Sequence, residues 1–144
     1  MNHAYDWPFG WNNNLMTQEQ MIDTWSMADD SLSYTFTLRD DLQFHDGTPV
    51  LAEDVAATMH RWHTSIGTAS TIWDLFGDPT IEVVDDKTYK VNGSKSFGLW
   101  VAYSGVAPIF VMPKSLADSL EPEDVNTNYI GSGPMKFVEW QPGF

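Results

Sequence analysis

The sequence predicts an α+β domain in which helices cover a small, mixed but largely antiparallel sheet. The clearest strand spans residues 31–38, where every even position is apolar and every odd position is serine or threonine. This alternation is typical of a half-buried strand, with Tyr34 and Phe36 on the buried face. After it the apolar period changes to that of a helix, on a stripe made of Ala52, Val55, Met59, Trp62 and Ile66. We expect that stripe to cover the aromatic face of the strand.

The segments before this strand predict a hairpin and little regular structure upstream of it. Residues 1–19 carry at most a weak helical patch, and the three asparagines at 12–14 favour a turn. Residues 20–27 alternate as a short strand, and Ala28-Asp29-Asp30 can turn it back into the main strand. The stretch Asp46-Gly47-Thr48-Pro49 predicts the turn between strand and helix.

The second half predicts shorter elements of both kinds. Gly77 is a candidate helix terminator, and Ser96 and Pro113 are candidate helix starts. The expected elements are a helix over 68–77, a hairpin of strands 80–84 and 88–92, a helix over 96–103, a strand over 109–112, a helix over 113–120, an acidic connector over 121–128 and a strand over 135–140.

Composition limits the classes of protein to consider. The chain has 144 residues, enough for one domain over 1–144, and 42% of them are apolar, which excludes a disordered chain. No apolar run reaches the ~20 residues of a membrane span, and the first ten residues do not resemble a secretory signal. A net charge of −13 argues against nucleic acid as a partner, and the absence of cysteine excludes disulfides.

Candidate catalytic and metal residues are few and have structural explanations. His60 and His63 are three apart on one predicted helix, but no HExxH pattern accompanies them. His45 precedes a turn aspartate and is expected to bond that turn. The paired carboxylates lie in predicted loops, and GSGP at 131–134 is not a nucleophile or phosphate motif. The sequence therefore predicts no catalytic residue, no metal site and no cofactor.

Four short stretches, in the same order along the chain, resemble one known family. The first runs from Leu38-Arg39 through FHDG at 44–47 to Ala52, Asp54 and Val55; the others are MIDTW at 21–25, FVMP at 110–113, and GSGP at 131–134 with its following Phe137 and WQPG. Together they resemble the family 5 extracytoplasmic solute-binding proteins of ABC importers, the peptide, dipeptide and nickel class. The chain departs from that pattern at Ser31, where the family usually has glycine, and at Leu51, where it usually has threonine.

The resemblance implies a fragment of a larger, two-lobed protein that performs no chemistry. The chain would be the α+β subdomain inserted into the first lobe of a periplasmic-binding-protein-like fold. The complete protein would bind a short peptide or related small solute between its lobes and present it to the membrane permease, on the periplasmic or extracellular side. The fragment itself would be mainly scaffold, with weak or no ligand binding.

The aromatic residues divide into two groups. Those on periodic faces are expected in the core, namely Trp25, Tyr34, Phe36, Trp62 and Phe137. Tyr5, Trp7, Phe9 and Trp11 follow no period, and they are candidates either to line a ligand cleft or to contact the rest of the receptor. Exposed aromatics of the second kind would favour self-association or strand exchange of the fragment.

Two other functions remain open from the sequence. One is a stand-alone carbohydrate- or peptide-binding module that uses Trp7, Trp11 and Trp100 as stacking platforms. The other is a hydrolase domain, which would need a cluster of buried carboxylates or histidines.

Overall fold

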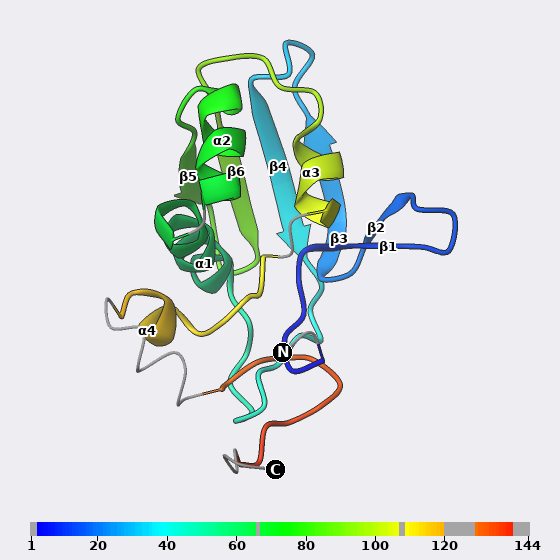
Figure 1. The fold of residues 1–144 in the computed structure, drawn as a ribbon, viewed down its shortest axis with the longest axis vertical. Helices are drawn as coiled ribbons and strands as arrows, with labels where there is room; N and C mark the ends of the chain where they lie inside the picture. The colour runs from blue at the N-terminus through cyan, green and yellow to red at the C-terminus, as the bar shows by residue number, and fades with distance from the viewer. Residues whose placement is uncertain (1–2, 66, 107–108, 120–128, 140–144) are drawn as a thin grey trace.

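A computed structural model describes residues 3–65, 67–106, 109–119 and 129–139. These residues form a four-stranded antiparallel sheet of order β3-β4-β6-β5 and a separate hairpin, β1-β2. The helices α1, α2 and α3 lie on one side of the larger sheet (Figure 1). The elements are β1 (Phe9–Trp11), β2 (Thr17–Glu19), β3 (Ile22–Met27), β4 (Ser33–Leu38), α1 (Ala52–Ser65), α2 (Gly67–Phe76), β5 (Thr80–Val83), β6 (Thr88–Asn92), α3 (Trp100–Val106) and α4 (Lys114–Ala117).

Strand β4 is the centre of the core, as its alternation predicts. Tyr34, Phe36 and Leu38 are each no more than 1% exposed, whereas the serine and threonines between them are half-buried on the other face. Phe36 stands opposite Tyr89 of β6, and the two rings stack with centroids 5.1 Å apart. The α+β class and the hairpins β3-β4 and β5-β6 are confirmed.

Helix α1 occupies a different place from the one expected. Its apolar residues Val55, Met59 and Trp62 are buried, but its main contacts are with α2, α4, β5 and β6. Besides rings of the neighbouring strands, Tyr34 contacts Phe76 of α2 and Phe36 contacts Phe9 of β1. The loop after β4 runs below the sheet and returns on the side of β5 (Figure 1), so order along the chain does not give the neighbour in space.

Several other expectations are wrong or partly wrong. Residues 9–19 form the hairpin β1-β2, and neither 109–112 nor 135–139 is a strand. Helix α3 begins at Trp100 rather than near 96, and α4 is a single turn. Trp25 is 40% exposed because β3 is an edge strand, and Phe137 is only half-buried. The expectations for Ile66, Leu120, the connector 121–128 and Trp140 lie outside the described residues.

Turn chemistry follows the sequence closely. Gly47 has φ 90° in the turn before α1, and Gly77 has φ 76° directly after α2. Ser31 has φ 55° in the β3-β4 turn, a left-handed conformation that glycine adopts without steric cost. The glycine usual in the family at this position is therefore explained by the backbone.

The start of α1 carries half of a capping box, which leads to a stability prediction. Asp54 Oδ2 accepts a hydrogen bond from the Leu51 amide at 2.9 Å, but Leu51 has no side-chain oxygen to return one. We expect Leu51→Thr to raise the free energy of unfolding by about 1 kcal/mol, because the hydroxyl can accept the Asp54 amide. Thermal and urea melts measure the change. Leu51→Val has the same shape as threonine without the hydroxyl, and an equal gain there would contradict the explanation.

Candidate functional site

Three segments far apart in sequence meet below the sheet (Figure 1), and we call residues 3–6, 44–47 and 131–135 the junction. The His45 amide donates to the Gly131 carbonyl at 2.8 Å. On the other side, the Gly133 amide donates to the Ala4 carbonyl at 3.0 Å and the Met135 amide to the His3 carbonyl at 2.9 Å. The 131–135 segment is thus held between the N-terminal segment and the turn that precedes α1.

Both glycines of this segment are required because its backbone lies so close to the N-terminal segment that a side chain would not fit. A Cβ on Gly131 would lie 1.9 Å from the Ala4 carbonyl oxygen, and one on Gly133 would lie 2.6 Å from the His3 carbonyl oxygen. Real Cβ atoms do not come within 3.0 Å of such atoms. The GSGP motif is therefore a packing element, which agrees with the turn predicted for it and not with a nucleophile or phosphate loop.

His45 holds the junction together through its backbone amide and its ring. Its Nε2 lies 2.7 Å from the Gly133 carbonyl oxygen, so this nitrogen carries the proton. Asp46 Oδ1 accepts bonds from the amide and hydroxyl of Thr48, and these bonds lower the pKa of Asp46. Within the described residues, no group of three or more histidine, cysteine or acidic side chains gathers as a metal site. His63 stacks on Trp73, with ring centroids 4.7 Å apart.

Asp6 is a junction residue that sequence reasoning did not single out. Its Oδ1 accepts a 2.7 Å hydrogen bond from the Gln20 amide group, and its carbonyl accepts one from the Val111 amide at 3.0 Å. Burial raises the pKa of Asp6, and this outweighs the lowering by the hydrogen bond from Gln20 and by the charge of Arg39. Its sequence signal was its place in the aromatic stretch over 5–9, which resembles an element of the same family.

The raised pKa of Asp6 predicts a pH dependence with a definite sign. A carboxyl whose pKa rises on folding stabilises the fold most below its unfolded pKa, and that contribution is lost as pH rises through the folded pKa. We therefore expect the stability of Asp6→Asn relative to wild type to increase between pH 4 and pH 7. Urea melts across this range measure the difference.

Asp85 provides a control of opposite sign. Its Oδ1 accepts bonds from the amides of Lys87 and Thr88, chiefly the first, and its pKa is lowered. A lowered pKa stabilises above the unfolded value and the contribution is lost as pH falls. Asp85→Asn should therefore lose stability relative to wild type as pH rises. Parallel slopes for Asp6→Asn and Asp85→Asn would contradict the assignment.

The four aromatic residues proposed for ligand or interface contact do not share one surface. Tyr5 and Phe9 are 5% and 2% exposed, Trp7 is half-buried, and Trp11 is 47% exposed on the hairpin beside α3. Tyr5 and Trp7 contact Phe110, with ring centroids 5.9 and 5.4 Å away. Phe110, for which the sequence predicted no site role, therefore forms a half-buried aromatic pair with Trp7. The accessible candidates for a solute or interface contact are Trp7 and Trp11, and this role stays a prediction.

The structure does not favour the two other functions. Trp100 is 2% exposed and packs on Trp73 and Phe76, so its proposed role as a stacking platform is wrong. Asp54 is a buried carboxylate, 7% exposed, but both its oxygens accept backbone amide hydrogen bonds. Its carboxylate therefore serves the fold, because each oxygen holds a backbone amide at a helix start.

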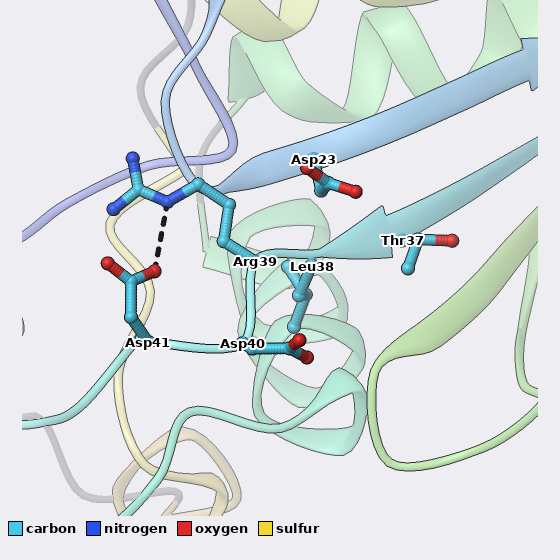
Figure 2. Close-up of a pocket in the computed structure, with 6 residues that line it drawn as sticks. All are labelled: Asp23, Thr37, Leu38, Arg39, Asp40 and Asp41. Atoms are coloured by element: carbon cyan, nitrogen blue, oxygen red, sulfur yellow. Dashed lines mark hydrogen bonds and ion pairs between the residues drawn. The ribbon is translucent and has the colours of Figure 1, made fainter.

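A shallow depression of about 460 Å³ opens where β4 ends. It is lined by Asp23, Thr37, Leu38, Arg39, Asp40 and Asp41. Arg39 points toward Asp41 (Figure 2), with Nε 3.3 Å from Oδ1, and both side chains are largely exposed. An exposed ion pair of this kind contributes little, and the depression is a solvated surface.

Comparison with known proteins now gives the class. The family described as bacterial extracellular solute-binding proteins, family 5 Middle, matches residues 17–143. A probable peptide ABC transporter periplasmic-binding protein, y4tO of Sinorhizobium fredii, is 35% identical over 133 residues, which are 92% of this chain and 24% of that protein.

Solved structures agree. The binding protein AgaA from A. tumefacien, in complex with agropinic acid, matches with a TM-score of 0.83 and 27% identity over 98% of this chain and 28% of its own. NikZ from Campylobacter jejuni, in complex with Ni(L-His), matches with a TM-score of 0.77 and 28% identity over 99% of this chain and 29% of its own. The family match and these structures place the chain among the bacterial extracellular solute-binding proteins. The chain belongs to the family 5 bacterial extracellular solute-binding proteins, and it spans about a quarter of the length of the relatives it matches.

Proposed function

We propose that this chain is part of the solute-binding component of an ABC importer, which works on the periplasmic or extracellular side. The complete receptor would close two lobes on a short peptide or related small solute and present it to the permease. The family match over residues 17–143 carries this proposal. One relative named above is a probable peptide-transporter binding protein, and the two solved structures hold agropinic acid and Ni(L-His). Peptides and these two ligands are small polar solutes. No helix among the described residues has the length and apolarity to cross a bilayer.

Within that receptor, this chain would act mainly as scaffold. Many of its large aromatic side chains are buried in its own core. The residues of its junction form hydrogen bonds with one another's backbone. The depression at Arg39 lacks the mostly apolar, concave lining of a small-molecule site. Calorimetric titration of the chain with a dipeptide should show little or no binding, and micromolar affinity would refute the scaffold role.

The exposed apolar side chains support the expected self-association. Trp11, Leu15, Met16, Trp25 and Met27 are 40–72% exposed on the β1-β2 hairpin and on the edge strand β3. Such a surface beside a free strand edge favours contact with the remainder of the receptor, or with another copy when the remainder is missing. Light scattering at high concentration should show species larger than a monomer. A monodisperse monomer would contradict this expectation.

A further inference from the structure

Helix α1 has a second stripe, which is polar and which the sequence did not reveal. Asp54, Thr58 and Arg61 are spaced four and three apart and therefore lie on one side of the helix, where α4 packs. Asp54 and Thr58 are 7% and 3% exposed, although neither belongs to the apolar face of the helix. We call these three residues the polar stripe.

All three side chains of the polar stripe form hydrogen bonds with the backbone of residues 112–119. The Thr58 hydroxyl accepts the Met112 amide at 3.2 Å and lies 3.3 Å from the Met112 carbonyl, to which it donates. One side chain thus pairs with both backbone groups of a residue, as a neighbouring strand would. Asp54 Oδ1 accepts a hydrogen bond from the Lys114 amide at 2.7 Å. The N-cap residue of α4, Pro113, has no side-chain acceptor for the free amides of that helix, so Asp54 caps it instead. Arg61 donates to the carbonyls of Ala117 and Ser119 at the end of α4.

The same segment leads directly to the aromatic contact at the junction. Val111 donates its amide to the Asp6 carbonyl, and Phe110 next to it rests on Tyr5 and Trp7. Neither 109–112 nor its partner 4–6 is in a strand, so no sheet ladder fixes this stretch. On its C-terminal side, Phe110 is followed by two hydrogen-bonded residues: Val111, which bonds Asp6, and Met112, which bonds Thr58.

We propose that the polar stripe positions residues 110–114 and that Thr58 is the positioning residue that sets the Phe110 ring against Trp7. The polar stripe forms its hydrogen bonds to that segment with backbone atoms, so these bonds do not depend on which side chains the segment carries. The inference deepens the proposed function, because Trp7 and Phe110 then form a fixed half-exposed surface for the rest of the receptor. Its test needs no solute, and its failure is therefore separate from failure of the proposed function.

Amide hydrogen exchange of the 144-residue chain, followed by NMR, tests the role of Thr58. Thr58→Val removes the hydroxyl at constant shape, and we expect Met112 exchange to rise at least about 10-fold more than that of Val91 in the core. The Phe110 ring signals should shift as the ring moves relative to Trp7. Thr58→Ser keeps the hydroxyl and should restore both readouts. Equal acceleration at Met112 and Val91, or unchanged Phe110 signals, would overturn the proposal.

A second variant keeps the proposal testable if Thr58→Val does not fold. Arg61 is partly exposed, so Arg61→Met should fold while losing the bonds to the end of α4. We expect faster exchange at Asp118 with Val91 unchanged. Exchange at Asp118 that follows Val91 in the variant would show that the stripe only supports global stability and would overturn the proposal.

Discussion

Gly131→Ala is expected to lower the free energy of unfolding by about 3 kcal/mol, the upper part of the usual range for overpacking. The added Cβ would lie 1.9 Å from the Ala4 carbonyl oxygen and 2.8 Å from the Ala4 carbonyl carbon. Both atoms belong to the backbone, so no rotamer change relieves the contact, and the N-terminal segment must move away. That movement also breaks the bond between the Gly133 amide and the Ala4 carbonyl. Urea denaturation measures the loss.

Gly98 provides a matched control for this substitution. A Cβ there would meet nothing closer than the Ser31 hydroxyl at 3.9 Å, and its φ is not in the left-handed region. Gly98→Ala should change stability by no more than about 0.5 kcal/mol in either direction. Equal losses for Gly131→Ala and Gly98→Ala would show that the junction is not tightly packed.

Phe36→Ala is expected to cost about 4 kcal/mol, within the range for removing a fully buried phenylalanine. Phe36 is 0% exposed and contacts the rings of Phe9, Tyr34 and Tyr89. Its removal leaves a cavity between the hairpin β1-β2 and the sheet, because three large rings cannot all shift to fill it. Thermal and urea melts should show the loss with the m-value unchanged.

The neighbouring position on the opposite face controls for effects on the strand itself. Thr35 stands between Ser26 and Lys90 on the half-buried polar face of the sheet. Thr35→Val keeps the β-branched shape and should change stability by less than about 0.5 kcal/mol. A loss of stability for Thr35→Val as large as that for Phe36→Ala would contradict the assignment of the core to the Phe36 face of β4.

The sequence predicted the features that depend on local chemistry. Alternation predicted β4 and its buried face, the glycines at 47 and 77 predicted a turn and a helix end, and the two short strand patterns at 80–84 and 88–92 predicted the β5-β6 hairpin. The family resemblance rested on short motifs, and the structure explains several of them. Gly131 and Gly133 are needed for close packing, His45 bonds Gly133, and Asp54 caps two helices.

The features that sequence reasoning missed depend on contacts between distant segments. The hairpin β1-β2 lacks a clear alternation, because only Phe9 of its first strand is buried. Trp25 follows the strand period but is exposed, because nothing in the period reports that β3 is at an edge. The positions of α1, Asp6 and Phe110 follow from how the chain crosses the junction. No local pattern encodes such a crossing.

An NMR structure of the 144-residue chain by itself is the most direct test of whether core and junction form one scaffold without the rest of the receptor. We expect nuclear Overhauser contacts between Phe36 and Tyr89 in the core and between Gly133 and Ala4 at the junction. Core contacts without the junction contacts would show that the scaffold closes only with the rest of the receptor. That result would contradict the expectation.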